Sequence, residues 1–491
     1  MIIMTKEERN EIIDLWDFSK IVTQGSWEPV PHLNIIVEFL HYAFNGQLEN
    51  FACALSPRLG KSMTVSEIFP AYILGMRPYA KIIHVSYSDS LARSFGGKVK
   101  NILDEFGNLF PEKPILSQDT KAKNWFKINN NTGEYFCSGS SGSVLGRGGH
   151  WIIVDEPSKN IEDARSERHQ EKLIDLFDTT ISTRKEKDPI TGQNAVTLVI
   201  HQRLDQNDLI GIILKNREWI TAEEALNRLR LGEKLGHIWV YLRIPELAEE
   251  NDILGRKPGE ALWPEKRDVK VLAQIKKDIG EIKFNSIHQQ NPQPPGDNLL
   301  KLSWIKYYKS HEIPPLKMLN VYQGWDLAIS ERTTADFTVC TTIGVSDENK
   351  VYILDWYRDK IDFPKAVKKV IELYEKWSPL EVGIEVNNFQ KALAQTLEQN
   401  SMIPIKEITS TSDKVTRILS AFVHFENGKV LLPDKHSELE NFTNEYIYFP
   451  HGKHHDDMLD SLELTLQLVR EPYYDLDPCL IVGDDPYYYE Q

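Results

Sequence analysis

Residues 51–62 read FACALSPRLGKS, an apolar run that leads into a short turn ending in Gly60, Lys61 and Ser62. A glycine-containing turn between a strand and a helix presents backbone N–H groups and a helix N-terminus to phosphate oxygens. In such a site Lys61 would reach the β and γ phosphates of a nucleotide, and the Ser62 hydroxyl would bind Mg²⁺. Leu55 stands where the first glycine of a standard phosphate-binding loop belongs, so an ordinary helix start is the alternative.

Three further apolar runs follow the first one: KIIHVSYS at 81–88, WIIVDEP at 151–157 and AVTLVIHQ at 195–202. Longer segments between them have the composition of helices. This alternation predicts a parallel sheet that is covered by helices on both faces. We therefore expect an α/β fold in the N-terminal half.

The run at 151–157 ends in two acids, Asp155 and Glu156. Both would lie at the carboxyl end of a buried strand, where open α/β sheets bind their ligands. Asp155 would hold Mg²⁺ through water, and Glu156 would polarise the attacking water. An acidic helix cap is the alternative, but Gly60-Lys61-Ser62 lies upstream at the separation usual for P-loop ATPases. Together the two motifs predict an ASCE-type P-loop ATPase domain.

A different order of elements begins near residue 317. Residues 321–328, 337–345 and 350–358 (VYQGWDLA, FTVCTTIGV and KVYILDWYR) read as three strands joined by short connections. A helical pattern at 363–377 and the strand pattern LEVGIEV at 380–386 follow. Three strands followed by alternating helix and strand predict an RNase H-like α/β fold.

That fold would gather acids from distant parts of the sequence. Its first strand lies beside and parallel to its fourth, so Asp326 and Glu385 would project at one edge. The last helix would turn Asp456 inward, next to Asp457, with Asp460 one turn later at its flank. Converging carboxylates repel one another unless divalent cations neutralise them. Two metals held there would activate water and stabilise the leaving oxygen of a phosphodiester; solvated surface charge is the alternative for any one acid.

From residue 27 to residue 469 these motifs resemble the large terminase subunits of tailed double-stranded DNA phages. That family has an arginine-bearing phosphate loop, like Pro57–Ser62 here, and a Gly-Arg segment before the acidic strand, like residues 146–149 here. The resemblance implies that Arg147 is an arginine finger, acting on its own site or on a neighbouring subunit. It implies that the nucleotide is bound by Ser56, Pro57, Arg58, Leu59, Gly60, Lys61, Ser62, Asp155 and Gln202, with Ser62 and Asp155 on the metal.

Residues 195–211 resemble the coupling segment of the same family. Arg203, Asp208 and Leu209 keep its pattern, whereas Gln202 stands where a threonine is usual. The amide of Gln202 could still sense the γ-phosphate, so the resemblance implies a coupling role with a changed detail.

Residues 27–32 (WEPVPH) resemble the start of the family's ATPase domain, which lies near the adenine, and residues 258–265 and 289–292 resemble its connector. By themselves the two connector segments are only turn-rich loops. We predict an ATPase domain over 1–250 with a lid near 205–250, a connector over 251–315, a nuclease domain over 316–470 and an acidic aromatic tail over 471–491.

For the nuclease, the resemblance assigns metal ligation to Asp326, Glu385 and the pair Asp456–Asp457, with Asp456 favoured within the pair. Asp336 also matches a family acid and could assist.

Two further pairs flank these acids. His454 and His455 lack the other ligands of a zinc site and are expected behind the metal ligands or facing DNA. Lys414 and Arg417 resemble a basic pair that would hold the DNA backbone without reading its sequence.

Composition limits the function in other ways. The net charge of −15 and the pI near 5.5 argue against a nonspecific nucleic-acid coat, but they permit an enzyme with a local basic channel. We find no signal-peptide pattern and no apolar run long enough to cross a bilayer. The four cysteines are scattered, as is typical of a reduced cytosolic protein.

The expected function is that of a viral DNA-packaging motor. It would hydrolyse ATP to move double-stranded DNA into a procapsid and would cut concatemers with an endonuclease that uses Mg²⁺ or Mn²⁺. The resemblance implies a ring of copies on the portal protein, a small terminase subunit as partner, and a place in the host cytoplasm. The alternative is a helicase or translocase of superfamily 2 type with an RNase H-like nuclease domain, acting in recombination or repair.

Overall fold

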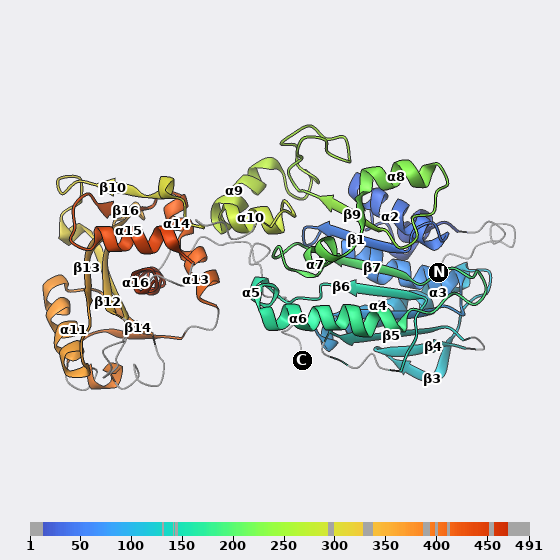
Figure 1. The fold of residues 1–491 in the computed structure, drawn as a ribbon, viewed down its shortest axis with the longest axis horizontal. Coiled ribbons are helices and arrows are strands. Elements are labelled where there is room, and N and C mark those ends of the chain that lie inside the picture. Colours follow the sequence, from blue (N-terminus) through green and yellow to red (C-terminus); the bar gives the residue numbers. More distant parts are fainter. Residues whose placement is uncertain are drawn as a thin grey trace. The chain divides into compact units, whose positions relative to one another are not determined.

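The computed structural model contains two compact units (Figure 1). The N-terminal unit comprises Met1–Gln274 and Glu281–Pro294, and the C-terminal unit comprises Ile275–Gly280 and Pro295–Gln491. The structure describes residues 13–129, 132–140, 142, 146–292, 299–327, 337–385, 393–397, 401–409, 413–450 and 456–469. Asp336, His454, His455 and the predicted tail lie outside these residues.

The N-terminal unit is built on a sheet whose centre is parallel. β1 (Asn50–Leu55) lies between β7 (Val196–His201) and β9 (Trp239–Ile244). On the far side of β7 come β6 (Trp151–Asp155) and then β2 (Lys81–Ser86). One strand thus separates the strand of the phosphate loop from the strand of the two acids. This is the order expected of an ASCE-type ATPase, and it confirms the predicted fold.

The sheet extends beyond this parallel centre at both edges. β5 (Glu134–Gly139) pairs parallel with β2, and the antiparallel strands β4 (Trp125–Ile128) and β3 (Leu116–Ala122) continue from it. β8 (Trp219–Thr221) closes the other edge beside β9. The antiparallel extension was not part of the sequence-based prediction.

Helices cover both faces of this sheet, as the alternation of strand and helix patterns predicted (Figure 1). Ile152 and Ile153 are neighbours in β6, and they belong to different hydrophobic clusters. Ile153 shares its cluster with Phe39 of α2 (Pro31–Phe44), whereas Ile152 shares the other with Leu173 of α6 (Glu167–Asp175). Helices of this unit are α1 (Leu15–Val22), α2 (Pro31–Phe44), α3 (Phe69–Met76), α4 (Asp89–Phe106), α5 (Ile161–Arg165), α6 (Glu167–Asp175), α7 (Leu209–Asn216), α8 (Ala222–Arg230) and α10 (Glu281–Ile287); α9 (Val269–Ile279) crosses the division of the chain.

The C-terminal unit has a mixed sheet of the predicted RNase H-like order. β11 (Asn320–Asp326), β12 (Thr338–Val345) and β13 (Val351–Asp359) form an antiparallel meander. β14 (Glu381–Glu385) pairs parallel with β11 on its other side. The sheet is completed by β10 (Lys306–Tyr308), β15 (Ile405–Ile408) and β16 (Val430–Pro433).

Two helices cover opposite faces of β11. Trp325 points into a cluster with Ala366 and Val370 of α11 (Phe363–Trp377). The preceding residue, Gly324, faces α16 (Asp457–Leu466) so closely that an added Cβ would lie 2.3 Å from the Thr465 hydroxyl. A glycine is therefore required where α16 approaches the end of β11. Further helices of this unit are α13 (Lys414–Ala421), α14 (Val423–Glu426) and α15 (Leu439–Tyr448).

Candidate active sites

The phosphate loop begins where β1 ends. Arg58 and Gly60 both adopt positive φ angles, of 64° and 87°, and the left-handed turn at Gly60 suits a residue without Cβ. The turn buries Lys61, whose side chain is 3% exposed and whose Nζ donates to Glu156 Oε1 at 2.8 Å. Two motifs that lie 95 residues apart in the sequence therefore meet at the carboxyl ends of β1 and β6.

Asp155 is fully buried beside this ion pair. Its Oδ2 accepts a hydrogen bond of 2.6 Å from the Ser66 hydroxyl, and its Oδ1 has no hydrogen-bond partner. Burial, followed by the charge of Glu156, raises the pKa of Asp155 to about 7, against the opposing effects of Lys61 and Ser62. A buried carboxylate oxygen without a hydrogen-bond partner fits a hydrated Mg²⁺, which prefers oxygen ligands.

The pKa of Glu156 is shifted in the opposite direction from that of Asp155. The charge of Lys61 holds the pKa of Glu156 below its usual value, which keeps this carboxylate ionised. Glu156 also has a positive φ of 49°, a backbone conformation that is uncommon for a residue with a side chain. Strained residues of this kind cluster at active sites. Their surroundings thus shift the pKa values of the two adjacent acids in opposite directions.

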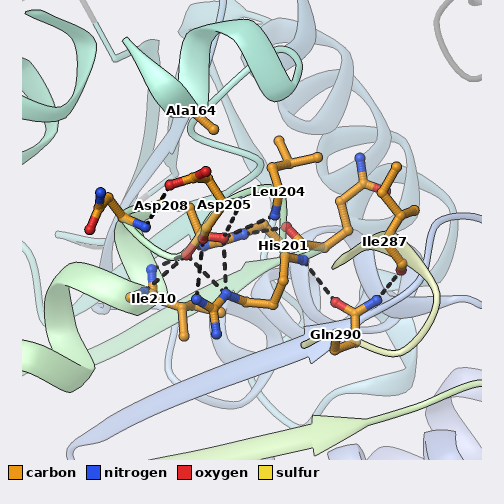
Figure 2. A network of polar contacts seen from close by, with 12 residues as sticks. Ala164, His201, Leu204, Asp205, Asp208, Ile210, Ile287 and Gln290 are labelled. Atoms are coloured by element: carbon orange, nitrogen blue, oxygen red, sulfur yellow. Dashed lines mark hydrogen bonds and ion pairs between the residues drawn. The ribbon is translucent and has the colours of Figure 1, made fainter. Parts of the chain in front are cut away.

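The segment after β7 forms a buried polar network (Figure 2). Arg203 Nε donates to both oxygens of Asp208, at 3.0 and 2.9 Å. Asp208 also accepts from the backbone N–H of Leu204 and Gly211 and caps α7. The side-chain oxygen of Gln202 is buried without a hydrogen-bond partner. Arg203 and Asp208 are therefore committed to holding this segment, whereas Gln202 has capacity left for a ligand.

Residues 27–32 contact the phosphate loop and the helical turn that follows it. Trp27 Nε1 donates to the Thr64 hydroxyl at 3.0 Å, and His32 Nε2 lies 3.0 Å from the carbonyl oxygen of Leu59. Burial lowers the pKa of His32 to about 4, so its ring is neutral at pH 7.

Arg147 lies at a different edge of the sheet. Its guanidinium pairs with Glu134 at 3.4 Å and stacks on the rings of Trp125 and Phe136. Glu134 begins β5, whereas the last residue of that strand, Gly139, lies level with the acids of β6. At a rise of about 3.3 Å per residue the two ends of β5 are about 16 Å apart. The structure does not bring Arg147 to Lys61 within one copy of the chain.

The second group of acids lies at one end of the C-terminal sheet. β11 and β14 run parallel with Trp325 opposite Ile384, so Asp326 and Glu385 follow at the same end. Burial raises the pKa of Asp326 well above its usual range, and Asp460, Asp457 and Glu385 raise it further, whereas Lys414 opposes them. The structure thus brings together acids from two strands and from α16.

The first turn of α16 distributes its acids unevenly. Asp457 accepts a hydrogen bond from the Phe337 N–H at 3.3 Å, and it is one of the acids that act on Asp326. Asp456 pairs with Lys414, whose Nζ lies 2.5 Å from its Oδ1. Asp460 also pairs with Lys414, and burial raises the pKa of Asp460 to about 6. Asp460 was not among the predicted site residues, although it lies three residues after Asp457 and thus on the same helix face.

This donor set fits a divalent cation. Carboxylates near Asp326 repel one another, and Asp460 Oδ1 is buried without a hydrogen-bond partner, with the guanidinium of Arg417 3.7 Å away. Oxygen ligands of this kind suit Mg²⁺ and Mn²⁺. Among the residues that the structure describes, however, no three acid, histidine or cysteine side chains already form a metal cage.

The predicted DNA-binding pair, Lys414 and Arg417, sits against these acids. Arg417 donates to Glu463 at 2.7 Å, and Lys414 bridges Asp456 and Asp460. Both cations belong to α13, so this helix supplies positive charge to the acidic face of α16.

Comparisons with known proteins identify the C-terminal region. Residues 323–468 match the family described as the terminase RNaseH-like domain. No curated protein matches the chain. No helix in the described part of the chain is long and apolar enough to cross a membrane.

Solved structures of terminases are similar at low identity. The large terminase of a thermophilic bacteriophage is 12% identical, covers 84% of this chain and 90% of its own, and gives a TM-score of 0.45. The HK97 bacteriophage large terminase is 12% identical over 90% of this chain and 95% of its own, with a TM-score of 0.35. The large terminase nuclease of a second thermophilic phage, G20c, with bound magnesium, is 15% identical over 36% of this chain and 99% of its own, with a TM-score of 0.29. These likenesses are too weak to transfer an activity. The family match itself confirms the predicted resemblance in this region, because residues 323–468 match the terminase RNaseH-like domain family.

Proposed function

We propose that the chain is a large terminase subunit, in which the N-terminal unit hydrolyses ATP to move double-stranded DNA and the C-terminal unit cuts it. One observation carries the proposal: the terminase RNaseH-like domain follows a unit in which a phosphate-loop lysine meets two acids at the ligand edge of its sheet. A nuclease alone would not need the Lys61–Glu156 pair.

In the proposed ATPase cycle, bound Mg²⁺–ATP supplies the γ-phosphoryl group and its charge-neutralising cation. Lys61 would exchange its bond to Glu156 for the phosphate oxygens. Glu156 would then be free to orient water and accept its proton, and Ser62 and Asp155 would hold the metal. The ion pair at 2.8 Å thus keeps the base occupied until nucleotide arrives.

Arg147 would act on a neighbouring subunit. Its distance from Lys61 along the sheet disfavours action on its own site, and its side chain is 28% exposed. A ring of copies, as in a motor on a portal protein, would present this guanidinium to the next copy's nucleotide. An arginine finger supplied in this way is worth about 10³- to 10⁵-fold in rate.

In the proposed nuclease, divalent metal supplies an activated water and stabilises the leaving oxygen. Asp326 and Glu385 would hold it from the sheet, and the start of α16 would contribute Asp456 or Asp457. Lys414 and Arg417 would turn from the acids of α16 to the phosphate backbone of DNA, since charged contacts of that kind position DNA without reading its sequence. A small terminase subunit would then supply recognition of the packaging start, in the host cytoplasm.

The test is a pair of assays on three proteins. Wild type, Lys61→Ala and Asp326→Ala are each assayed for ATP hydrolysis and for Mn²⁺-dependent cleavage of plasmid DNA. We expect Lys61→Ala to lose hydrolysis and keep cleavage, and Asp326→Ala to show the reverse. Cleavage that is unaffected by Asp326→Ala would remove the nuclease from the proposal, and hydrolysis that survives Lys61→Ala would remove the ATPase.

A further inference from the structure

One glutamine in the N-terminal unit bonds simultaneously to the phosphate loop and to the segment after β7. Gln290 lies in the turn after α10 and is 1% exposed. Its Oε1 accepts from the backbone N–H of Arg203 at 2.8 Å, and its Nε2 donates to the Ser56 hydroxyl at 3.2 Å and to the carbonyl oxygen of Ile287. Every donor and acceptor of this amide except the second lone pair of Oε1 is therefore used.

The side chain of Gln290 is oriented so that its amide contacts two different segments of the N-terminal unit. Figure 2 shows its amide pointing toward Ile287 on one side and toward the network of Asp205 and Asp208 on the other. Its φ angle is +53°, a conformation that non-glycine residues adopt only when the surroundings fix it. The backbone here is held in an uncommon shape that directs the side chain into the site.

The phosphate loop is bound to the same segment from its own side. Ser56, the first residue after β1, is fully buried, and its hydroxyl donates to the carbonyl oxygen of Ile287 at 3.0 Å while it accepts from Gln290. Earlier in the connector, Arg267 donates to the carbonyl oxygen of Pro57 at 2.6 Å, and Lys266 donates to that of Arg58 at 3.3 Å. Three consecutive loop residues are thus tied to the connector.

The chain leaves the N-terminal unit shortly after this contact. Residues 281–294 are the last part of that unit, and the chain then enters the C-terminal unit at Pro295. A change in the phosphate loop that displaces Ser56 must break or move the bonds of Gln290, because a buried polar group without a partner is costly. The segment that leads into the nuclease is therefore bonded to the part of the ATPase unit that would bind phosphate.

We propose that Gln290 is a positioning residue that couples the nucleotide state of the phosphate loop both to the segment after β7 and to residues 281–290, the stretch of connector that leads to the nuclease. This inference rests on the proposed ATP site. The amide of Gln290 is hydrogen-bonded to both Ser56 and the N–H of Arg203. A movement of the phosphate loop would therefore move the segment after β7 and residues 281–290 with it.

Hydrogen exchange tests the coupling without requiring turnover. Full-length wild type is compared with and without a non-hydrolysable ATP analogue, and exchange is followed in residues 56–62 and in residues 281–290. We expect the analogue to slow exchange in the first segment and to change it about fivefold or more in the second, the scale of a typical coupling free energy. In Gln290→Ala the response should remain at 56–62 and vanish at 281–290.

Two further variants keep the result interpretable. Gln289→Ala is the matched control, because the amide of Gln289 bonds instead to the backbone of Leu247, at 2.9 Å in each direction. It should behave as wild type in both segments. Gln290→Glu retains the size and an acceptor for Arg203, and its ionised form has no donor for Ser56 or Ile287. At a pH that keeps it ionised it should lose the response at 281–290 even if Gln290→Ala fails to fold.

The outcomes separate the two claims. A response at 281–290 that survives in Gln290→Ala or in Gln290→Glu overturns the relay, and so does a wild type that responds at 56–62 alone. Equal loss in Gln289→Ala overturns it as well, because the effect would then belong to the connector in general. If wild type shows no response at 56–62, the proposed ATP site fails first, and the relay fails with it.

Discussion

The two acidic sites of the chain differ in how their charge is balanced. In the N-terminal unit the cation is built in: Lys61 lies buried against Glu156 and keeps that carboxylate ionised. In the C-terminal unit the acids exceed the nearby cations, and the pKa of Asp326 is raised well above its usual range by burial and by Asp460. The first arrangement is poised to exchange one anion for another. The second is poised to take up a cation.

The largest expected effect is on the base of the first site. Glu156→Gln removes the proton acceptor but preserves the shape, so ATP hydrolysis should fall by about 10²- to 10⁴-fold, the usual contribution of general base catalysis. Binding of a fluorescent ATP analogue should persist. The control is Glu186→Gln, which changes an exposed acid paired with Lys81. Undiminished hydrolysis in Glu156→Gln would mean that another group activates the water.

The second site should respond most to the acid at the end of β11. Asp326→Asn should lower metal-dependent plasmid cleavage on the order of 10³-fold, as loss of a group that stabilises the transition state does. Within α16, Asp460→Asn should impair cleavage more than Asp456→Asn, because Asp460 acts on Asp326 more strongly than any other acid. A larger loss in Asp456→Asn would support the ligand choice made from the sequence, which favours Asp456.

Stability of the first site should depend on a buried ion pair. Asp208→Ala leaves Arg203 buried without its carboxylate and removes the cap of α7, so it should destabilise the N-terminal unit by about 3 kcal/mol or more. Chemical denaturation followed by tryptophan fluorescence measures the change. A loss below about 1 kcal/mol would show that water replaces the carboxylate at Arg203.

The stability of the C-terminal unit should depend on pH through Glu445. Burial raises the pKa of Glu445 to about 8 from an ordinary value of 4.5. The folded state then holds a proton that the unfolded state releases, so stability is full below about pH 4.5 and is lost as pH rises toward 8. Glu445→Gln can still accept from the Met458 N–H and should flatten this decline, which metal-free melting curves across that range would record. Parallel pH profiles for the two proteins would contradict the assignment.

The smallest expected effects come from matched helix caps. Thr221 caps α8 in the N-terminal unit and Asp362 caps α11 in the C-terminal unit, through bonds to backbone N–H groups at 3.2 and 3.0 Å. Each alanine substitution should cost about 1 kcal/mol. If the units unfold separately, Thr221→Ala should lower the unfolding midpoint of the N-terminal unit alone. Asp362→Ala should lower that of the C-terminal unit alone. A shift of both transitions by either variant would indicate a single cooperative unit.

The comparison also explains what the sequence could predict. Lys61, Asp155 and Glu156 lie in short motifs at strand ends, and the strand order follows from alternating patterns, so the first site and both folds could be read from local signals. Asp460 could be placed only at the flank of the second site, because how far it turns inward depends on how closely α16 approaches Gly324. No local pattern reports that distance.

The contacts of Arg147 and Gln290 could not be predicted for a similar reason. The place of Arg147 depends on rings of β4 and β5, an antiparallel extension that the alternating pattern does not announce. The contacts of Gln290 with Ser56 join residues 234 positions apart. Turn-rich sequence gives no sign of such bonds, since they form only once the sheet and the connector are in place.

The most direct test of the contrast between the sites is a count of bound Mn²⁺ without nucleotide, by electron paramagnetic resonance. If the C-terminal site is the one that needs an added cation, wild type and Lys61→Ala should bind Mn²⁺ equally, and Asp326→Asn should lose that binding. Mn²⁺ binding that is unchanged in Asp326→Asn would contradict the account, because the acids at the end of β11 would then not be a metal site.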